Sequence, residues 1–236
     1  NDFIDQINSS RKHPVLDCEV PKNVKFLKFE NFAKEINEKV DLIVIAVIAK
    51  GIEWASVELS KVIKKNIPIL ILTKGLAINN NNYEVLAHKM ERLLKKNGIK
   101  ETNISAAGGP CLAKGLANKA HTSVVFANKD IKFAKEISKL VSTSYYHVFI
   151  SDDVIGVETC AAIKNIFSMA VGASRGLCDS IASKEKNYLN TAAALIQESI
   201  YEMSIFVEKL KGRKETVMGL AGIGDLYVSA DGGRNS

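Results

Sequence analysis

Residues 41–48 read DLIVIAVI, and residues 67–73 read IPILILT. Both are short apolar runs rich in β-branched residues, a composition typical of strands buried on both faces of a sheet. The segment between them, residues 50–65, carries apolar residues at helical spacing, among them Trp54 and Val62. A strand, a helix and a strand in this order predict a parallel pair, which is the repeating unit of an α/β fold.

The same alternation continues to about residue 150. It predicts two further helices, at residues 83–97 and 130–142, and three further strands, at residues 103–107, 122–127 and 145–150. Helices that alternate with buried strands predict a doubly wound parallel sheet. We therefore expect residues 1–150 to form an α/β domain.

From residue 151 onward the pattern changes. Residues 151–153 read SDD, a helix-capping signal, and an apolar stretch follows at residues 154–172. Residues 187–210 form a second long helical pattern, and no convincing strand signal comes after it. We expect residues 151–236 to form an all-α domain.

The apolar stretch 154–172 is long enough to raise the question of a membrane span. It contains two charged residues, Glu158 and Lys164. Holding these charges in lipid would cost several kcal/mol, so a buried core helix is the better interpretation.

The composition is that of a water-soluble globular protein. The chain has 236 residues, of which 47% are hydrophobic and 25% charged, enough to bury at least one sizeable core. Its net charge of +6 comes from 32 basic residues, but only five of them are arginines, and the lysines are interleaved with acids. Since nucleic-acid grooves are read by clustered arginines, we expect no nucleic-acid partner.

Cysteine usage and the N-terminal sequence bear on location. The four cysteines are too far apart for a C-x-x-C pair and too few for a disulfide framework, so a reducing cytoplasm is expected. Residues 1–17 are polar and lack the apolar stretch of a signal peptide. Because the first residue is not Met, we expect the sequence to be part of a longer chain.

Lys164 is the first candidate for chemistry. A lysine in the middle of an apolar helix must reach solvent, pair with an acid, or lie at a cavity with a shifted pKa. Desolvated lysines act as general acids, general bases or Schiff-base formers. The alternative, a solvated lysine on an outward stripe, fits the periodicity equally well.

Two strand ends and the C-terminal segment supply further candidates. Lys74 directly follows the strand 67–73, and the glycine-rich residues 106–115 follow another strand. Ligands of open α/β sheets bind at such ends, although a strand-end lysine is more often simply solvated. Near the C-terminus, Arg234 follows two glycines and offers a bidentate fork for phosphate or carboxylate. The alternative there is a surface turn.

Several motifs are absent from the sequence. It contains no G-x-G-x-x-G, and the G-x-G at Gly222 and Gly224 follows no strong strand. It contains no G-x-S-x-G, and its four histidines lack metal-ligand spacing, so we expect no metal site.

Five stretches, taken in order, resemble the NAD(P)-dependent glycerol-3-phosphate dehydrogenase family. They are LTKGL (72–76), GGPCLAKGLA (108–117), SDDVIGVETCAAIKNIF (151–167), NTAAALIQESIYEM (190–203) and GLAGIGDLYVSADGGRN (219–235). The resemblance implies a Rossmann-type domain that binds NAD or NADP, a helical substrate domain, and reversible reduction of dihydroxyacetone phosphate to sn-glycerol 3-phosphate. It also implies a cytoplasmic enzyme that supplies phospholipid biosynthesis.

The resemblance further implies roles for single residues. Lys164 would donate the proton to the substrate carbonyl, oriented by Asn165 and Asp225. Substrate contacts would come from Lys74, Gly109, Cys111, Asp225 and the phosphate-holding residues Gly233, Arg234 and Asn235, and cofactor contacts from Ala113, Lys74 and Arg234.

The chain departs from the family pattern in places. The first strand and the G-x-G-x-x-G loop are absent, so we expect a partial Rossmann-type sheet and weak binding of either nicotinamide cofactor. The chain ends one residue after Asn235, so the helical domain is also expected to be incomplete. Cys111 stands where the family usually has a hydroxyl residue, and Ala192 stands where it has a basic residue. Ile48 and Ala49 stand in place of part of the family's A-V-P-S motif.

Two other functions stay open. Another β-hydroxyacid-type dehydrogenase would bind a carboxylate in place of the phosphate, and a degenerate homologue would bind a ligand without catalysis. The sequence does not distinguish NAD from NADP, or a monomer from a homodimer.

Overall fold

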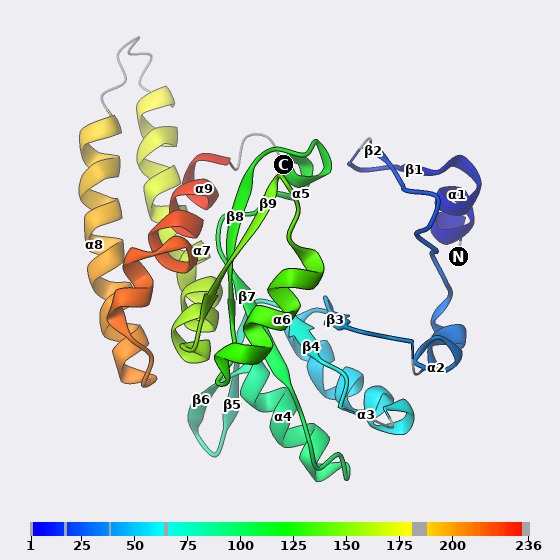
Figure 1. Cartoon of the computed structure of the whole chain (residues 1–236). Coiled ribbons are helices and arrows are strands. Elements are labelled where there is room, and N and C mark those ends of the chain that lie inside the picture. The colour runs from blue at the N-terminus through cyan, green and yellow to red at the C-terminus, as the bar shows by residue number, and fades with distance from the viewer. Residues whose placement is uncertain (1, 17, 38, 64–65, 181–187, 233–236) are drawn as a thin grey trace.

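The structure, a computed structural model, describes residues 2–16, 18–37, 39–63, 66–180 and 188–232. A five-stranded sheet lies at the centre of the molecule (Figure 1). The C-terminal helices lie on one side of this sheet, and an N-terminal segment lies on the other.

The central sheet has the strand order β3-β4-β7-β8-β9. Its strands are β3 (Ile43–Ile45), β4 (Ile69–Ile71), β7 (Ile104–Gly108), β8 (Thr122–Ala127) and β9 (Tyr146–Ser151). Strands β3, β4 and β7 are parallel to one another, as are β8 and β9, but β8 runs antiparallel to β7. The predicted α/β class is confirmed, and the sheet departs from the parallel arrangement at this one pair.

The short connection between β7 and β8 explains this departure. A parallel crossover usually needs a full helix to carry the chain back along the sheet. Here the chain turns at Gly109, which has a φ of 116°, and helix α5 (Ala113–Ala117) has only five residues. The chain therefore re-enters the sheet near the end at which β7 finishes.

Helices cover both faces of β4. Helix α6 (Ile131–Val141) packs on the face that presents Leu70. Helices α3 (Ile52–Val62) and α4 (Leu86–Lys96) pack on the opposite face, which presents Ile69 and Ile71. Because successive side chains of a strand point to opposite faces, an unbroken apolar run satisfies both layers.

A two-stranded hairpin precedes α4, where the sequence pattern predicted helix from residue 83. It consists of β5 (Leu76–Asn79) and β6 (Asn82–Val85). The turn residues Asn80 and Asn81 have φ angles of 48° and 61°, the signature of a type I′ turn. Asparagine tolerates this backbone better than most residues, which accounts for the run of four asparagines at 79–82.

The N-terminal segment lies to the right in Figure 1. It comprises helix α1 (Asp2–Ser10), the short strands β1 (Lys12–His13) and β2 (Cys18–Glu19), the 3-10 turn η1 (Phe29–Asn31) and helix α2 (Phe32–Glu35). Ile7 of α1 is fully buried, and the guanidinium group of Arg11 donates to the carbonyl oxygen of Val24 at 2.9 Å.

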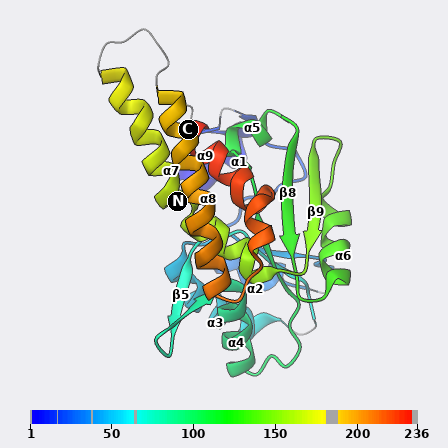
Figure 2. The same ribbon diagram turned by 90° about the vertical axis from the view of Figure 1, so that its left-hand side faces the viewer.

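The described residues of the C-terminal part form helices joined by short turns and include no strand. Its long helices are α7 (Val154–Ser180) and α8 (Tyr188–Lys209), followed by the 3-10 turn η3 (Lys214–Met218), the π-helical turn η4 (Leu220–Gly224) and helix α9 (Asp225–Gly232). Figure 2 shows α8 and α9 lying alongside α7, and α7 also packs on β7. One hydrophobic core joins residues of α7 to those of β3 and β4, so the division of the chain near residue 151 stays a prediction.

Helix α7 is also the one described helix whose length and composition would allow a membrane crossing, over Val154–Ser174. The two charged residues of the stretch Val154–Ser174, Glu158 and Lys164, are buried against other parts of the protein. The packing of α7 is that of a core helix.

Candidate functional site

Two lysines from distant parts of the chain meet at one carboxylate. Lys164 lies in α7, Asp225 is the first residue of α9, and Lys74 follows β4. The ammonium group of Lys164 donates to Asp225 Oδ1, and that of Lys74 donates to Asp225 Oδ2 at 3.0 Å. Asp225 therefore bridges two ammonium groups at the edge of the sheet where β4 ends.

The three side chains differ in exposure. The side chain of Asp225 is 2% exposed and that of Lys164 is 9% exposed, whereas the side chain of Lys74 is 41% exposed. Burial lowers the pKa of Lys164 to about 8, although Asp225 acts in the opposite direction, and the nearby charge of Lys74 lowers it further. Lys164 can therefore gain and lose a proton near neutral pH.

A π-helical turn positions Asp225. Turn η4 ends at Gly224, directly before Asp225, and π-helical turns are frequent at functional sites. Within it, a Cβ atom on residue 222 would lie 2.0 Å from the carbonyl oxygen of Val217, so only glycine fits there. Gly222 lets η4 fold onto η3 and hold Asp225 against α7.

Lys74 is fixed by the end of β4. The hydroxyl group of the preceding residue, Thr73, donates to the carbonyl oxygen of Val47 at 2.6 Å and ties the ends of β3 and β4 together. Sequence reasoning missed Thr73. Its position in a T-K-G stretch directly after an apolar strand was the available signal.

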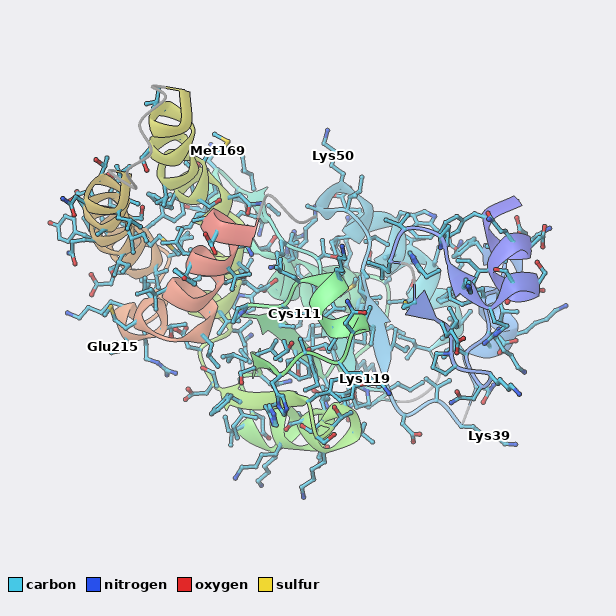
Figure 3. The ribbon with its side chains drawn as sticks, turned by 90° about the horizontal axis from the view of Figure 1, so that it is seen from above. Lys39, Lys50, Cys111, Lys119, Met169 and Glu215 are labelled. Atoms are coloured by element: carbon cyan, nitrogen blue, oxygen red, sulfur yellow. The ribbon has the colours of Figure 1, made fainter. Side chains whose placement is uncertain are left out.

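Cys111 lies close enough to Lys74 and Asp225 for their charges to act on its thiol. Burial raises the pKa of its thiol, while the charge of Lys74 lowers it and that of Asp225 raises it. Figure 3 shows Cys111 near the middle of the molecule, and its side chain packs against the cluster of Leu70, Val124, Phe126 and Ile137 on the α6 side of the sheet. The structure thus places Lys74, Cys111, Lys164 and Asp225 in one neighbourhood.

The other predicted residues are placed differently. A Cβ atom on Gly109 would lie 3.1 Å from Val124 Cα, so this glycine packs on β8, and Ala113 is exposed at the start of α5. Asn165 is exposed, and among the described residues no hydrogen bond links its side chain to Lys164. Gly233, Arg234 and Asn235 lie outside the described residues.

A pocket of about 230 Å³ lies between α7, α8 and α9. Val171, one of its lining residues, is seven positions after Lys164 and therefore points from the same face of α7. Ala192 and Ala193 leave space on the side of α8, and Asp231 contributes an acid. The described lining is mostly apolar and supplies no cation for an anionic group.

Comparisons with known proteins place the chain among the glycerol-3-phosphate dehydrogenases. The family model for the N-terminus of NAD-dependent glycerol-3-phosphate dehydrogenase matches residues 1–134, and the model for the C-terminus matches residues 153–236. Together the two models cover nearly all of the chain.

Two curated relatives show the extent of the similarity. The NADP(+)-dependent glycerol-3-phosphate dehydrogenase of Archaeoglobus fulgidus is 28% identical over 234 residues, which are 99% of this chain and 67% of the relative. The glycerol-3-phosphate dehydrogenase [NAD(P)+] of Clostridium tetani is 32% identical over 210 residues, which are 89% of this chain and 55% of the relative. The chain thus spans between about half and two thirds of the length of these relatives.

Solved structures agree with the sequence matches. The crystal structure of glycerol-3-phosphate dehydrogenase from Coxiella burnetii superposes with a TM-score of 0.78 at 26% identity, and covers 97% of this chain and 65% of that one. The enzyme from Plasmodium falciparum, at 22% identity and a TM-score of 0.80, supports the fold. The predicted resemblance is confirmed, and the chain belongs to the NAD-dependent glycerol-3-phosphate dehydrogenase family.

Proposed function

We propose that this protein is an oxidoreductase that interconverts dihydroxyacetone phosphate and sn-glycerol 3-phosphate with NAD(H) or NADP(H). The observation that carries the proposal is the pairing of Lys164 and Lys74 with one buried carboxylate, Asp225. This pairing lies at the carboxyl end of β4, and ligands of open α/β sheets bind at such ends. The relatives described above are named for the same activity.

The chemistry of ketone reduction suits Lys164. A hydride that arrives at the carbonyl carbon builds negative charge on the carbonyl oxygen, and an ammonium group within hydrogen-bond reach stabilises that charge and donates a proton. With a pKa of about 8, Lys164 is protonated at neutral pH yet can release its proton. In the oxidation direction the neutral amine would accept the proton of the substrate hydroxyl group.

Asp225 and Lys74 have supporting roles in this proposal. Asp225 orients the ammonium group of Lys164 and keeps it charged despite its burial. Lys74 is the more exposed lysine, so its ammonium group is the one that an incoming substrate meets first. Cys111 lies beside them and would contact the substrate.

The described residues fit one end of a nicotinamide dinucleotide. Leu72 and Ile48 present exposed apolar surface where β4 and β3 end, which suits a flat ring beside Lys74. When bound, the cofactor would supply the hydride. Within the described ranges no glycine-rich loop opens a long helix, the feature that usually holds a pyrophosphate. We therefore assign only the nicotinamide end of the cofactor to this part of the chain, with Ala113 as a further contact.

The phosphate of the substrate is assigned to Gly233, Arg234 and Asn235. The pocket between α7, α8 and α9 ends at Asp231, two residues before them, and supplies no cation of its own among the described residues. A guanidinium group next to glycines matches phosphate oxygens in charge and geometry. Anchoring the phosphate would orient the carbonyl group toward Lys164.

The cellular setting follows from this activity. A source of sn-glycerol 3-phosphate serves phospholipid biosynthesis, and we place the protein in the cytoplasm, where nicotinamide cofactors and phosphorylated trioses are found. A homodimer stays an open prediction. Partners other than the small substrate and the cofactor are not required.

The proposal is tested by NADH and NADPH oxidation with the intact protein. We expect turnover with dihydroxyacetone phosphate and little with small keto acids. Lys164→Ala should lower kcat by about 10² to 10⁴, the usual effect of removing a general acid, without unfolding the protein. Lys114→Ala, the same substitution at an exposed lysine of α5, is the matched control and should be neutral. Turnover near that of the wild type in Lys164→Ala would disprove the role of Lys164.

Arg234 is tested with a substrate that lacks the phosphate. Arg234→Ala should lower kcat/KM for dihydroxyacetone phosphate by an amount equivalent to about 2–5 kcal/mol, and Arg234→Lys should recover part of it. With unphosphorylated dihydroxyacetone, wild type and Arg234→Ala should be equally slow. An equal loss on both substrates would show that Arg234 acts on the cofactor or the fold.

A further inference from the structure

Glu158 is a buried acid that the proposed reaction does not use. It lies in α7, its residue is 4% exposed, and it is surrounded by the core rather than by the candidate site. Its Oε2 atom accepts a hydrogen bond from the backbone N–H of Ala87 at 2.9 Å. Its Oε1 atom has no hydrogen-bond partner among the described residues.

Glu158 caps a helix that has no cap of its own. Ala87 lies in the first turn of α4, where backbone N–H groups lack partners within the helix. The residue at the N-cap position is Val85, whose side chain cannot accept a hydrogen bond. An acceptor that a local Ser, Thr or Asp would usually supply therefore comes from α7.

The capped end of α4 lies against the residue that follows Lys74. Strands β5 and β6 pair so that Leu76 is opposite Val85, which brings the start of α4 back to the start of the hairpin. A Cβ atom on Gly75 would lie 3.8 Å from Leu86 Cδ1. Gly75 also has a φ of 146°, so the backbone next to Lys74 has a conformation that other residues rarely adopt.

These contacts form a continuous chain of packed residues from the helix of Lys164 to Lys74. Glu158 and Lys164 belong to the same rigid helix, six residues apart. From Glu158 the connection runs through the first turn of α4 to Gly75 and Lys74. The two lysines then meet at Asp225, which closes the loop of contacts.

We propose that Glu158 is a positioning residue that sets how Lys74 and Lys164 meet at Asp225. The proposal rests on the proposed function for the roles of the lysines, whereas the geometry that it concerns does not depend on turnover. Glu158 acts by position and not by charge. Burial raises its pKa to about 8, so at neutral pH the carboxyl group keeps its proton and its other oxygen accepts from α4.

Because Glu158 acts as a neutral hydrogen-bond acceptor at a fixed place, glutamine should replace it. Glu158→Gln keeps an acceptor oxygen at nearly the same place and is neutral, like the protonated acid. Glu158→Leu has a similar volume but accepts no hydrogen bond, so the first turn of α4 loses its tie to α7. Lys74 should then move relative to Asp225.

Movement of Lys74 would change the pKa of Lys164 in one direction. The charge of Lys74 lowers the pKa of Lys164, and Lys74 shares the carboxylate that raises it. If Lys74 moves away from Asp225, both effects make Lys164 easier to protonate. In Glu158→Leu the pKa of Lys164 should therefore rise, by at least about half a unit.

The experiment measures the pKa of Lys164 by NMR in the full chain with isotope-labelled lysines, with the resonance assigned through Lys164→Arg. Glu158→Gln should give a pKa no higher than that of the wild type, because it only removes a carboxylate that ionises near pH 8, and Glu158→Leu should give a higher one. The control is Thr159→Val. Thr159 is fully buried in the same helix, and its hydroxyl group lacks a hydrogen-bond partner among the described residues, so this variant should match the wild type.

Two results would overturn the proposal. If Glu158→Leu folds and keeps the wild-type pKa of Lys164, Glu158 only stabilises α4. If Glu158→Gln shifts this pKa as much as Glu158→Leu does, the acid acts through its charge. Should Glu158→Leu not fold, Glu158→Met, which is unbranched and adapts to irregular space, makes the same measurement. A wild-type protein that does not turn over dihydroxyacetone phosphate would refute the proposed function and leave this test intact.

Discussion

At the scale of single residues, Asp225 controls the protonation of Lys164. One carboxylate serves two ammonium groups, and it is the group that opposes the effect of burial on the pKa of Lys164. Removing its charge while keeping its shape would leave two lysines facing each other without a counter-ion. Burial and Lys74 lower the pKa of Lys164 and Asp225 raises it, and the value of about 8 is the balance of these effects.

We expect Asp225→Asn to shift the pH dependence of the reaction. Without the negative charge the pKa of Lys164 falls, because burial and Lys74 both disfavour its ammonium form. Reduction of dihydroxyacetone phosphate needs that ammonium form, so the decline of kcat/KM at high pH should begin at a lower pH than in the wild type. The measurement is kcat/KM from about pH 6 to about pH 10.

Asp130→Asn is the matched control for this prediction. Asp130 caps α6 after the end of β8, at the edge of the sheet opposite to Lys74, and asparagine caps helices nearly as well as aspartate. This variant should keep the wild-type pH profile. An unchanged profile in Asp225→Asn would mean that another group titrates.

A functional residue could be predicted from the sequence where its side chain does not suit the residues around it. Lys164 is an ammonium group in an apolar helix, and that conflict is visible in the sequence itself. The partnership with Asp225 was not visible, because 61 residues separate the two and only the resemblance joined them. Asn165 shows that adjacency in the sequence can also mislead. It is next to Lys164 in the sequence, but neighbouring positions on a helix point about 100° apart.

At the scale of elements, Asp153 ties the start of α7 to the segment that leads to α9. Its carboxylate accepts from the N–H of Gly156 at 2.9 Å, the N–H of Arg213 at 3.0 Å and the hydroxyl group of Thr216 at 2.6 Å. It thus caps α7 and also holds η3, from which η4 and Asp225 follow.

We expect Asp153→Ala to lower the free energy of unfolding by about 2–3 kcal/mol, because it removes a helix cap and leaves buried donors unpaired. Urea denaturation measures this loss. Asp152→Ala is the comparison, since Asp152 is the neighbouring acid and forms an exposed ion pair with Arg213. That variant should change stability little. Equal losses in the two variants would contradict the account.

Long helices and buried strands were predicted better from the sequence than short elements were. The long apolar patterns predicted α8 and the buried strands to within a few residues of their observed bounds. They also predicted the start of α7, but not its end, because the helix continues past the apolar stretch to Ser180. The β5–β6 hairpin was missed because its strands are short and only partly buried, and only the asparagines of its turn mark it. The reversed direction of β8 depends on how a short connection folds in space, which periodicity does not record.

At the scale of the whole molecule, Glu158 makes stability depend on pH. Its pKa rises from the ordinary value of 4.5 to about 8 on folding, so the native state binds one more proton than the unfolded state between these values. The stability linked to this proton is complete below about pH 4.5 and is lost as the pH rises toward about 8.

We therefore expect the difference in free energy of unfolding between the wild type and Glu158→Gln to change with pH. Glutamine does not titrate, so the free energy of unfolding of Glu158→Gln relative to wild type should increase with pH from about 4.5 to about 8. The slope should be on the order of 1 kcal/mol per pH unit, and the difference should be constant above that range. Urea denaturation of both proteins across this range gives the difference directly, and a difference that is independent of pH would contradict the raised pKa of Glu158.

The bridging carboxylate has a consequence for protein synthesis. Asp225 follows Lys74 by 151 residues and Lys164 by 61, and a ribosome delivers the N-terminal residues first. Because α9 is synthesised after α7, it can dock only late. If a nascent α7 packed into the core before Asp225 emerged, it would bury Lys164 without its counter-ion. A chain that terminates early lacks both this carboxylate and the fully buried Leu226 beside it. Premature products would expose the core face of α7 to the proteases that remove unfinished proteins.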